Sequence, residues 1–575
     1  MAHFHIKRKK GKSYLYIREI SRVDGKPKVV KQTYIGSPER VARLFADLST
    51  AMPLQLQAEE FGSLWLANLI DRDIDLAGII DSIIPKSLQE KKPSVGEYFL
   101  YCVLNRMIEA VSKNKLADWY KNTAIRHIRP VEIKRLSSQL YWEKWDRVDE
   151  DDLKSISQLF FQRVWQKESP NPDCLLFDTT NYYTFMATET NSQLACRGKS
   201  KEGRHNLRQI GLGLLVTRDT RLPIYYREYP GNIHDSRLFE NIMDEMFGVV
   251  CGLNKGNESL TVVIDKGMNS ESNYTWIDEH SRIHFVTNYS PYFSEELTSI
   301  PLSRFELLDI EKNRRLLDEG KPKEQIWSYR TEGEYWGKRR TVILTYNPAT
   351  FRKQEYALAG KLKTLKQELL VMRAKFGKRE PQWRKAGVVK ERYVRLCERL
   401  HVSTDLYVLK FTKTESGAFM RFHRDVNRIN RKRAMFGKHI IITDNHDWTT
   451  EEIVEANLDR WQVEEKFRLS KDDDLVGTRP IRHWTDSKIR CHLFTCVAAM
   501  TYLRLLELRL SRAGINRTAE DVMSDMRHLH SMLYLRAGDK SFKRCVEKPT
   551  KKQKEVLAAF GYVVTPDGVL QPLKR

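Results

Sequence analysis

The spacing of apolar and polar positions changes several times along the 575-residue chain. Residues 13 to 36 read SYLYIREISRVDGKPKVVKQTYIG, where two β-rich runs flank Asp24, Gly25, Lys26 and Pro27. A turn of this composition between two such runs predicts a β-hairpin. We therefore expect residues 1 to 50 to form a small region built on this hairpin.

Residues 51 to 165 carry a helical repeat instead. Stretches such as FGSLWLANLI and VGEYFLYCVLNRMIEAV place apolar residues three and four positions apart. Alternating strand patterns are absent from this region, so we expect an all-α domain.

The pattern switches to strands at Pro170. DCLLFDTTNYYTF predicts a strand ending near Asp178, and two further strands and a helix beginning at Asp235 or Ser236 follow. LTVVID predicts a buried strand ending at Asp265, and a helix and another strand come after it. The order β-β-β-α-β-α-β predicts an α/β domain with a mixed sheet over residues 166 to 290.

Residues 291 to 437 interrupt this order with a long basic helical stretch between isolated strands. HIIITDN then returns to strand, and Thr449 with Glu452 three residues later forms a capping box that opens a helix through residues 457 to 471. A long amphipathic helix is expected up to Arg512. The segments are thus an insertion (291 to 437), a second part of the α/β domain (438 to 515) and a helical, then irregular tail (516 to 575).

The net charge of the chain indicates what kind of partner it binds. The chain has 98 Lys and Arg against 75 Asp and Glu, a formal net charge of +23. Such an excess is typical of proteins that meet a polyanion, most often nucleic acid, although a basic inert surface is the alternative. The basic N-terminal hairpin fits either a DNA contact or a plain cap on the next domain.

Cysteine usage and hydropathy exclude other classes. The eight cysteines form no C-x-x-C pair, and histidines show no zinc spacing, so neither a disulfide framework nor a structural zinc site is expected. No apolar stretch follows the basic N-terminus, and CHLFTCVAAMTYLRLLELRL is broken by charges short of a membrane span. We expect a cytoplasmic protein without membrane contact.

Two carboxylates are the first candidates for chemistry. Asp178 follows the apolar run CLLF, and Asp265 follows TVVI. If the two strands are neighbours, both side chains project at one sheet edge, and a third carboxylate on a packed helix would complete a trio. Carboxylate oxygens suit Mg²⁺ or Mn²⁺, and two such ions about 3.5–4 Å apart act on phosphodiesters. The alternative is that both aspartates are caps or turn residues.

Four motifs in order, LLFDTT, YREYPGNIHDS, VVIDKGM and NLDRWQVEEKFRLSK, resemble the DDE transposases of bacterial insertion sequences. The group with the signature Y-x2-R-x3-E-x6-K, insertion-sequence family four, is the most similar. Arg460, Glu464 and Lys471 fit its spacing, whereas Asn457 stands at the tyrosine position. The resemblance covers residues 166 to 512 and extends more loosely to the N-terminal regions.

The resemblance implies a fold and an activity. The fold is an RNase H-like catalytic domain in two parts, with the insertion between them and a helical DNA-binding domain at residues 51 to 165. Asp178, Asp265 and Glu464 would be the catalytic ligands of two Mg²⁺ or Mn²⁺ ions. The activity would be cleavage and strand transfer of double-stranded DNA at the ends of an insertion sequence, by a homodimer in a synaptic complex in the bacterial cytoplasm.

Helical phase discriminates between the adjacent glutamates. At roughly 100° per residue, Arg460, Glu464 and Lys471 lie within about 40° of one another, beside the apolar face. Glu465 lies about 100° from Glu464 and is expected to face solvent. We therefore expect Glu464 to be the ligand. An ordinary i, i+4 Arg–Glu pair on a surface helix is the alternative.

Several basic residues are candidate DNA contacts. Arg460 and Lys471 would hold phosphates near the cleaved end, as the resemblance implies. The turn CRGKSKEGRHNLRQ adds four more, which are either phosphate contacts or a solvated hairpin tip: Lys199, Lys201, Arg204 and Arg208.

Two further features have an ordinary structural explanation beside the functional one. Asp235 matches a family motif but also suits a helix N-cap. Trp327, Tyr335 and Trp336 could stack on an unpaired base or could belong to the core.

Two other functions remain open at this point. One is a catalytically silent, element-derived DNA-binding protein. The other is an RNase H-like nuclease that does not transpose.

Overall fold

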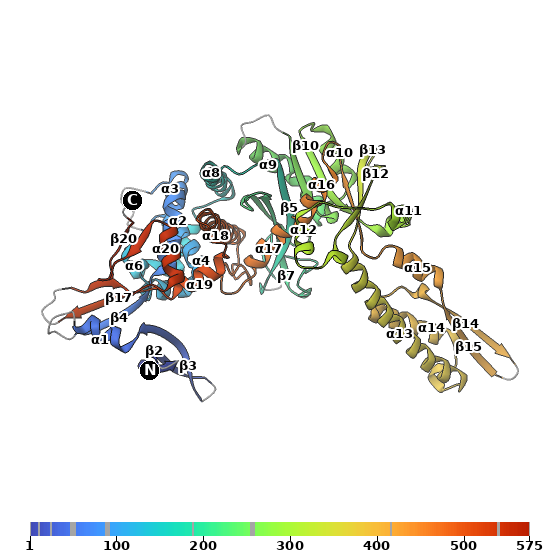
Figure 1. Ribbon diagram of the computed structural model, residues 1–575, viewed down its shortest axis with the longest axis horizontal. Helices are drawn as coiled ribbons and strands as arrows, with labels where there is room; N and C mark the ends of the chain where they lie inside the picture. The colour runs from blue at the N-terminus through green and yellow to red at the C-terminus, as the bar shows by residue number, and fades with distance from the viewer. Residues whose placement is uncertain are drawn as a thin grey trace. The chain divides into compact units, whose positions relative to one another are not determined.

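The computed structural model describes residues 2–9, 12–23, 26–46, 53–86, 93–186, 189–253, 259–414, 417–536 and 541–573 (Figure 1). The chain forms two compact units. The first comprises Met1–Pro172, Leu176–Gly256 and Trp461–Arg575, and the second comprises Asp173–Leu175 and Asn257–Arg460. Each unit is described separately below.

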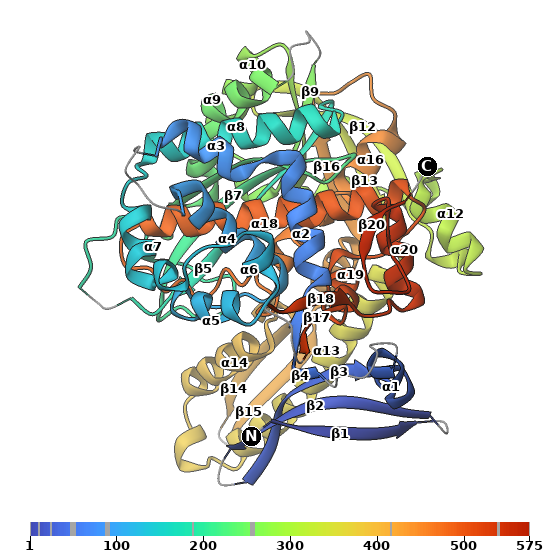
Figure 2. The same cartoon turned by 90° about the vertical axis from the view of Figure 1, so that its left-hand side faces the viewer.

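The N-terminus of the first unit is a three-stranded antiparallel sheet, ordered β1 (Ala2–Lys9), β2 (Lys12–Val23) and β3 (Lys26–Gly36) (Figure 2). The helix α1 (Pro38–Ala46) follows it. The predicted hairpin is confirmed as β2–β3, but the sequence reading missed β1, whose short alternation around Phe4 and Ile6 gives way to the uniformly basic residues 7 to 9. The predicted turn residues Asp24 and Gly25 lie outside the described residues.

Helices then dominate, as predicted for this region. They are α2 (Gly62–Ile74), α3 (Leu76–Ile83), α4 (Val95–Ile108), α5 (Leu116–Lys121), α6 (Ile125–Ile128), α7 (Ser138–Trp145) and α8 (Glu150–Glu168). Capping boxes at Ser94 and Asp149 define where α4 and α8 begin.

The core of this helical region is α18 (Asp486–Arg512), which packs against α2, α4, α7 and α8. Among the described residues, α18 is the one helix long and apolar enough to cross a membrane by length and composition, contrary to the sequence-based expectation. Most of its apolar stretch, 83%, is buried within the described protein, as in the core helix of a folded domain.

Two expectations about regular structure in the first unit were wrong. The supposedly all-α region begins with the strand β4 (Pro53–Glu60), and the supposedly irregular tail contains β17 (His530–Arg536), β18 (Lys543–Val546), β19 (Tyr562–Val564) and β20 (Leu570–Pro572). The strands β4, β17 and β18 form one antiparallel sheet. The same C-terminal region also contains the helices α19 (Ala519–Arg527) and α20 (Lys551–Ala559). A pairing over such a sequence distance leaves no local signal.

The first unit also holds most of the strand that carries Asp178. This strand is β5 (Cys174–Thr184), and it belongs to a sheet with β7 (Arg208–Thr217), β8 (Pro223–Pro230) and the short β6 (Cys196–Arg197). The helices α9 (Asp235–Leu253) and α17 (Trp461–Ser470) complete this part.

The second unit is built on a mixed sheet in the order β11-β12-β13-β16-β10-β9, which Asp173–Leu175 at the start of β5 continue. Only the β9–β10 pair is parallel among these strands. The strands are β9 (Leu260–Ile264), β10 (Ile283–Tyr289), β11 (Glu306–Leu307), β12 (Trp327–Tyr335), β13 (Lys338–Tyr346) and β16 (Lys438–Thr443). Its shorter helices are α10 (Glu271–Glu279), α11 (Glu295–Thr298), α12 (Glu311–Asp318) and α16 (Thr450–Leu458). An α/β fold with a mixed sheet is thereby confirmed.

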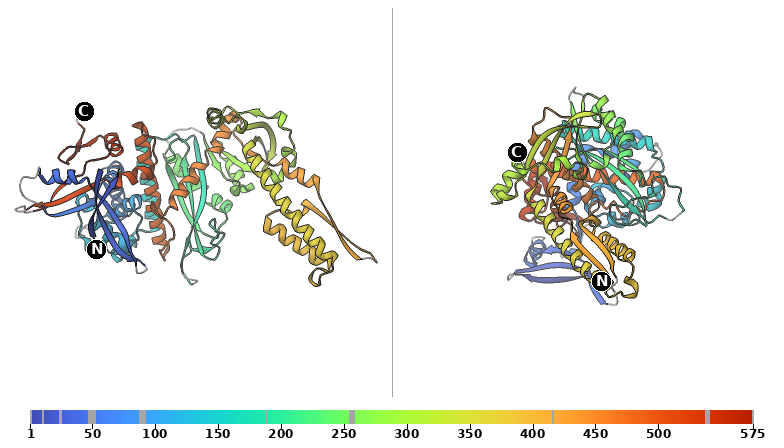
Figure 3. Two further views of the ribbon diagram at one scale, coloured as in Figure 1. Left: turned by 60° about the horizontal axis from the view of Figure 1, so that its bottom comes forward. Right: turned by 90° about the vertical axis from the view of Figure 1, so that its right-hand side faces the viewer.

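A segment with its own hydrophobic core leaves this sheet between β13 and β16. The helix α13 (Pro348–Gly377) lies beside α14 (Ala386–Leu400) and the hairpin of β14 (Tyr407–Thr414) and β15 (Gly417–Arg424), and α15 (Val426–Ala434) closes the segment (Figure 3). Leu365, Leu369 and Cys397 are fully buried in its core. We call residues 348 to 434 the helical insertion.

Candidate active site

Asp178 occupies the middle of a strand and not its end. The run TTNYYT continues β5 to Thr184, because its β-branched and aromatic residues suit a buried strand. Asp178 is half-buried, whereas every other residue of β5 is buried. One oxygen of its carboxylate, Oδ1, accepts a hydrogen bond from the backbone N–H of Thr179 at 2.7 Å.

A lysine from the predicted basic turn reaches the residue next to Asp178. Lys201 Nζ donates to the carbonyl oxygen of Thr179 at 2.6 Å and to its hydroxyl at 3.0 Å, and it pairs with Asp235 Oδ2 at 3.6 Å. The Tyr229 hydroxyl donates to Asp235 Oδ1 at 3.3 Å. Burial, reinforced by the carboxylates of Asp235 and Asp178, raises the pKa of Tyr229. Asp235 is thus the first residue of α9 and also a member of this charged group.

The other cations of the turn also contact the protein. The Arg204 guanidinium lies 4.5 Å from the ring centre of Tyr183, and Arg208 Nη1 donates to the carbonyl of Ala195 at 2.9 Å. Lys199 is exposed. The turn is therefore folded onto β5 and is more than a solvated tip.

Asp265 lies directly after β9, as predicted. In the second unit its Oδ1 accepts a hydrogen bond from Arg460 Nη1 at 2.5 Å. The Arg460 side chain is 19% exposed. The arginine expected to hold phosphate therefore neutralises one of the expected metal ligands in this structure.

The helix through residues 457 to 471 is broken, which corrects the helical-phase argument. The helix α16 ends at Leu458 and α17 begins at Trp461, so Arg460 does not share a helix with Glu464. The helix that begins after Thr449 therefore carries neither glutamate, and both lie on α17. A phase counted across the break has no meaning.

The burial of the two glutamates also differs from the expectation. Glu464 is exposed on α17, and Glu465 is half-buried. Glu465 lies near the fully buried Lys466, whose pKa burial lowers to about 8. The exposed side of α17 is instead formed by Trp461, Glu464 and Arg468.

The end of α17 is attached to the sheet of the first unit. The hydroxyls of Tyr182 on β5 and Ser470 form a buried hydrogen bond at 2.7 Å. Lys471 Nζ pairs with Glu202 Oε1 at 3.1 Å, and Arg479 pairs with the other carboxylate oxygen of Glu202. Sequence reasoning missed Glu202, although an acid inside a run of Lys and Arg was a usable signal.

Two of the three candidate aromatic residues of the second unit pack against other rings. Trp336 stacks on Tyr274 at 3.8 Å between ring centres, and Tyr335 contacts Tyr289 at 5.2 Å. Trp327 is partly exposed, at 39%. Tyr335 and Trp336 are half-buried, and ring packing within the second unit accounts for their positions.

The donor set can be tested against a divalent metal. Three carboxylates, Asp178, Asp265 and Glu464, have the oxygen chemistry that Mg²⁺ and Mn²⁺ require. Within the part of the chain that is described, however, no three Asp, Glu, His or Cys side chains form a group that could hold a metal ion. Asp178 and Glu464 belong to the first unit and Asp265 to the second. The three carboxylates therefore have the donor atoms that Mg²⁺ or Mn²⁺ prefers.

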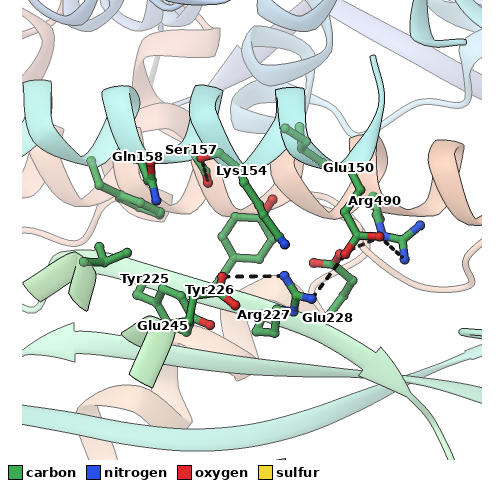
Figure 4. A pocket seen from close by; sticks show the side chains of 13 residues that line it. Glu150, Lys154, Ser157, Gln158, Tyr225, Tyr226, Arg227, Glu228, Glu245 and Arg490 are labelled. Atoms are coloured by element: carbon green, nitrogen blue, oxygen red, sulfur yellow. Dashed lines mark hydrogen bonds and ion pairs between the residues drawn. The ribbon is translucent and has the colours of Figure 1, made fainter. Parts of the chain in front are cut away.

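A separate pocket in the first unit contains none of these residues (Figure 4). Its charges pair with one another across α8, β8, α9 and α18. Arg227 contacts Glu150 at 3.2 Å and Glu245 at 3.5 Å, and Arg490 contacts Glu150 at 2.9 Å and Glu228 at 3.0 Å. This ion-pair network connects the helices to the sheet.

The sequence model of the family described as "Transposase DDE domain" matches residues 183–502. The match includes Asp265 and Glu464 and begins five residues after Asp178. No curated protein matches the chain.

Two solved structures show weak similarity. A piggyBac transposase synaptic complex with hairpin DNA is 11% identical, with a TM-score of 0.37, and the alignment covers 82% of each chain. A Mos1 transposase paired-end complex with the left transposon end is 10% identical, with a TM-score of 0.15, over 41% of this chain and 74% of that one. At these scores neither likeness supports an argument about fold.

Proposed function

Because the chain belongs to the transposase DDE domain family, we propose that it is the DNA transposase of a bacterial insertion sequence. The family match over residues 183–502 is the observation that carries this proposal. The spacing of Arg460, Glu464 and Lys471 supports the narrower assignment to the Y-x2-R-x3-E-x6-K group, with Asn457 in place of the tyrosine. DNA transposition and DNA recombination would then be its biological role.

The proposed catalytic residues are Asp178, Asp265 and Glu464, acting as ligands of two Mg²⁺ or Mn²⁺ ions in an RNase H-like domain. Such ions, when bound, lower the pKa of a water and stabilise the leaving oxygen of a phosphodiester. A carboxylate that is not fully buried is accessible to an ion arriving from solvent. Asp178 is the one residue of β5 that is not buried, and Glu464 is exposed on α17, which supports both assignments.

The reaction would proceed in two displacements at phosphorus. Water attacks a phosphodiester at the element's end, and the 3′-oxygen leaves and takes up a proton. The freed 3′-hydroxyl then attacks a second phosphodiester, loses its proton and displaces another 3′-oxygen. Cleavage and strand transfer therefore use the same three carboxylates.

Six cations are proposed to contact DNA phosphates, and three of them must first exchange a carboxylate partner. Arg460 is paired with Asp265 and Lys471 with Glu202, so a phosphate has to replace a carboxylate at each. The same reasoning applies to Lys201, which is paired with Asp235. The remaining three are Lys199, Arg204 and Arg208.

The proposed division of labour follows the predicted segments. Residues 51 to 165 would bind DNA, residues 166 to 290 and 438 to 515 would form the catalytic domain, and residues 291 to 437 would form its insertion. The partners would be the element ends and target DNA, bound by a homodimer in the cytoplasm without membrane contact.

The direct test is Mg²⁺-dependent cleavage of DNA that carries the element's own ends. Asp178→Asn, Asp265→Asn and Glu464→Gln should each reduce cleavage at least about 100-fold, since each removes one ligand charge. Glu465→Gln is the matched control on the same helix and should cleave like the wild type. Equal activity of Glu464→Gln and wild type would sink the assignment.

Two rival functions have their own readouts. A catalytically silent DNA-binding protein would bind the ends but show no divalent-dependent nicking. A nuclease that does not transpose would nick but fail to join a labelled end to a plasmid. The match to the transposase family favours transposition over both.

A further inference from the structure

The three-stranded N-terminal sheet has two chemically different faces. Residues directly opposite each other in a sheet project to the same side, and successive residues alternate. The register of β1, β2 and β3 therefore assigns one set of residues to a single face: His3, His5, Lys7, Lys12, Tyr14, Tyr16, Arg18, Gln32 and Tyr34. We call this set the tyrosine face.

Contacts between side chains confirm the assignment. The rings of Tyr14 and Tyr16 lie 6.1 and 5.3 Å from the ring of Tyr34. Arg18 Nε donates to Gln32 Oε1 at 2.6 Å. These contacts join β2 to β3 on one side of the sheet, although the register of the pair shifts at Leu15/Tyr16 and at Glu19/Ile20.

The tyrosine face has no negative charge among the side chains that the structure describes. Lys7, Lys12 and His3 are exposed, and Arg18 is half-exposed. The opposite face contains Glu19 and the apolar side chains of Phe4 and Ile6, which are 64% and 56% exposed. Cations therefore stand on both faces, since Arg8, Lys28 and Lys31 lie on the opposite one, and the tyrosine face is distinguished by its three tyrosines and by having no described carboxylate.

One end of the tyrosine face is covered by the rest of the first unit. Burial raises the pKa of Tyr34, and Glu547 adds to the effect. Arg40 of α1 donates to the carbonyl of Lys548 at 3.4 Å. The sheet is thus attached to the folded unit at this end, and its lysines remain exposed.

We propose that the tyrosine face binds the major groove of double-stranded DNA, at a site distinct from the catalytic carboxylates. The proposal deepens the transposase function above and rests on it. Strands lie about 4.8 Å apart, so three of them are about 10 Å wide, which fits a major groove about 12 Å wide. Lysine, arginine and tyrosine are donors suited to the phosphates that line such a groove.

The test compares two triple variants of the full chain that lose the same charge. The first, Lys7→Ala, Lys12→Ala and Arg18→Ala, removes three cations of the tyrosine face. The second, Arg8→Ala, Lys28→Ala and Lys31→Ala, removes three from the opposite face, where the register places them. The probe is a short fluorescein-labelled DNA duplex of random sequence, titrated at several salt concentrations.

The first variant should bind the duplex at least about tenfold more weakly. The slope of its log binding constant against log salt concentration should be shallower, by about 0.9 for each phosphate that the variant no longer neutralises. The second should bind within about twofold of the wild type. If both variants bind equally weakly, the loss of net charge alone explains the effect and the proposal is overturned. Unchanged binding in both variants would also overturn it. Melting temperatures check that both variants fold.

A double-stranded RNA probe tests the partner class. The major groove of A-form RNA is too deep and narrow for a sheet, so binding through the tyrosine face should be weak. RNA binding as tight as DNA binding, with the same weakening in the first variant, would contradict the proposal. Mg²⁺-dependent cleavage by wild type and Glu464→Gln, run in parallel, reports separately on whether the transposase proposal fails.

Discussion

Lys466 is a buried cation next to the two glutamates of α17. Its side chain is removed from water, and this burial lowers its pKa from 10.5 to about 8. Glu507 offsets part of the burial cost. Glu507 also accepts hydrogen bonds from Arg504 at 2.7 Å and from the backbone N–H of Ala519 at 2.9 Å. It therefore keeps partners if the lysine is replaced.

The first prediction concerns stability against pH. Between pH 8 and about 10 the unfolded chain holds the Lys466 proton and the folded chain does not, so stability should rise with pH there. Below pH 8 the folded and unfolded chains both hold the proton, and burying the charged lysine costs the full amount of about 3 kcal/mol. Lys466→Met should raise the melting temperature at pH 7. It should also abolish the increase in stability between pH 8 and about 10. Thermal melts from pH 7 to 10 measure this, with the exposed Arg468→Met as control; an unchanged rise in Lys466→Met would contradict it.

The Arg460–Asp265 pair gives a prediction about metal binding. Removing the guanidinium frees the Asp265 carboxylate and takes away a repelling charge. Arg460→Ala should therefore bind Mn²⁺ about tenfold more tightly in the absence of DNA, the effect of one partly screened unit charge. Calorimetric titration measures it, and cleavage should fall because alanine cannot hold a phosphate. Weaker Mn²⁺ binding by the variant would show that Asp265 is not a ligand.

At the scale of elements, the helical insertion is an independent packing unit. Leu365 is fully buried in its core, and Gly360 lies on an open side of the same helix, with nothing within 4 Å of where a Cβ would stand. Substitutions at these two positions of one helix should therefore change the free energy of unfolding of the insertion in opposite directions.

Leu365→Ala should destabilise the insertion by about 2–5 kcal/mol because it leaves a cavity. Gly360→Ala should stabilise it by up to about 1 kcal/mol, since alanine favours helix. Hydrogen exchange should quicken in residues 348 to 434 for the first variant and slow there for the second, while β5 stays unchanged. A Leu365→Ala effect spread evenly over the chain would show that the insertion has no core of its own.

Local patterns predicted most elements, whereas pairings between distant segments escaped prediction. The strand β9 before Asp265 and the capping box of α16 were predicted from the sequence, whereas the capping boxes of α4 and α8 were found only in the structure. The break before Trp461 has no Gly or Pro to mark it, and the charged Asp178 was taken as the end of β5 although the Thr and Tyr residues after it suit a strand.

The candidate site could be predicted only as a set of residues. The family resemblance proposes Asp178, Asp265 and Glu464 as the ligands, but the partners of their neighbours are far apart in the chain. Arg460 is 195 residues from Asp265, and Tyr182 is 288 residues from Ser470. No local periodicity reports such contacts, so the pairing of Arg460 with a carboxylate came only from the structure.

At the scale of the whole molecule, the net charge of +23 predicts strongly salt-dependent DNA binding. If six to ten phosphates are contacted, affinity for a duplex should fall about 10³- to 10⁵-fold between 50 and 200 mM salt. Fluorescence anisotropy over this range measures the slope. A flat slope would mean that the charge excess does not meet a polyanion.

The pairing of β4 with β17 has a consequence for how the protein is made. About 470 residues separate Glu60, at the end of β4, from His530, at the start of β17. At 5–20 residues per second a ribosome needs roughly 25 to 95 seconds to supply the missing partner. During that time β4 is an open edge, a template for pairing with another chain. We therefore expect a chain that ends before residue 530 to leave β4 unpaired and to aggregate instead of competing for DNA.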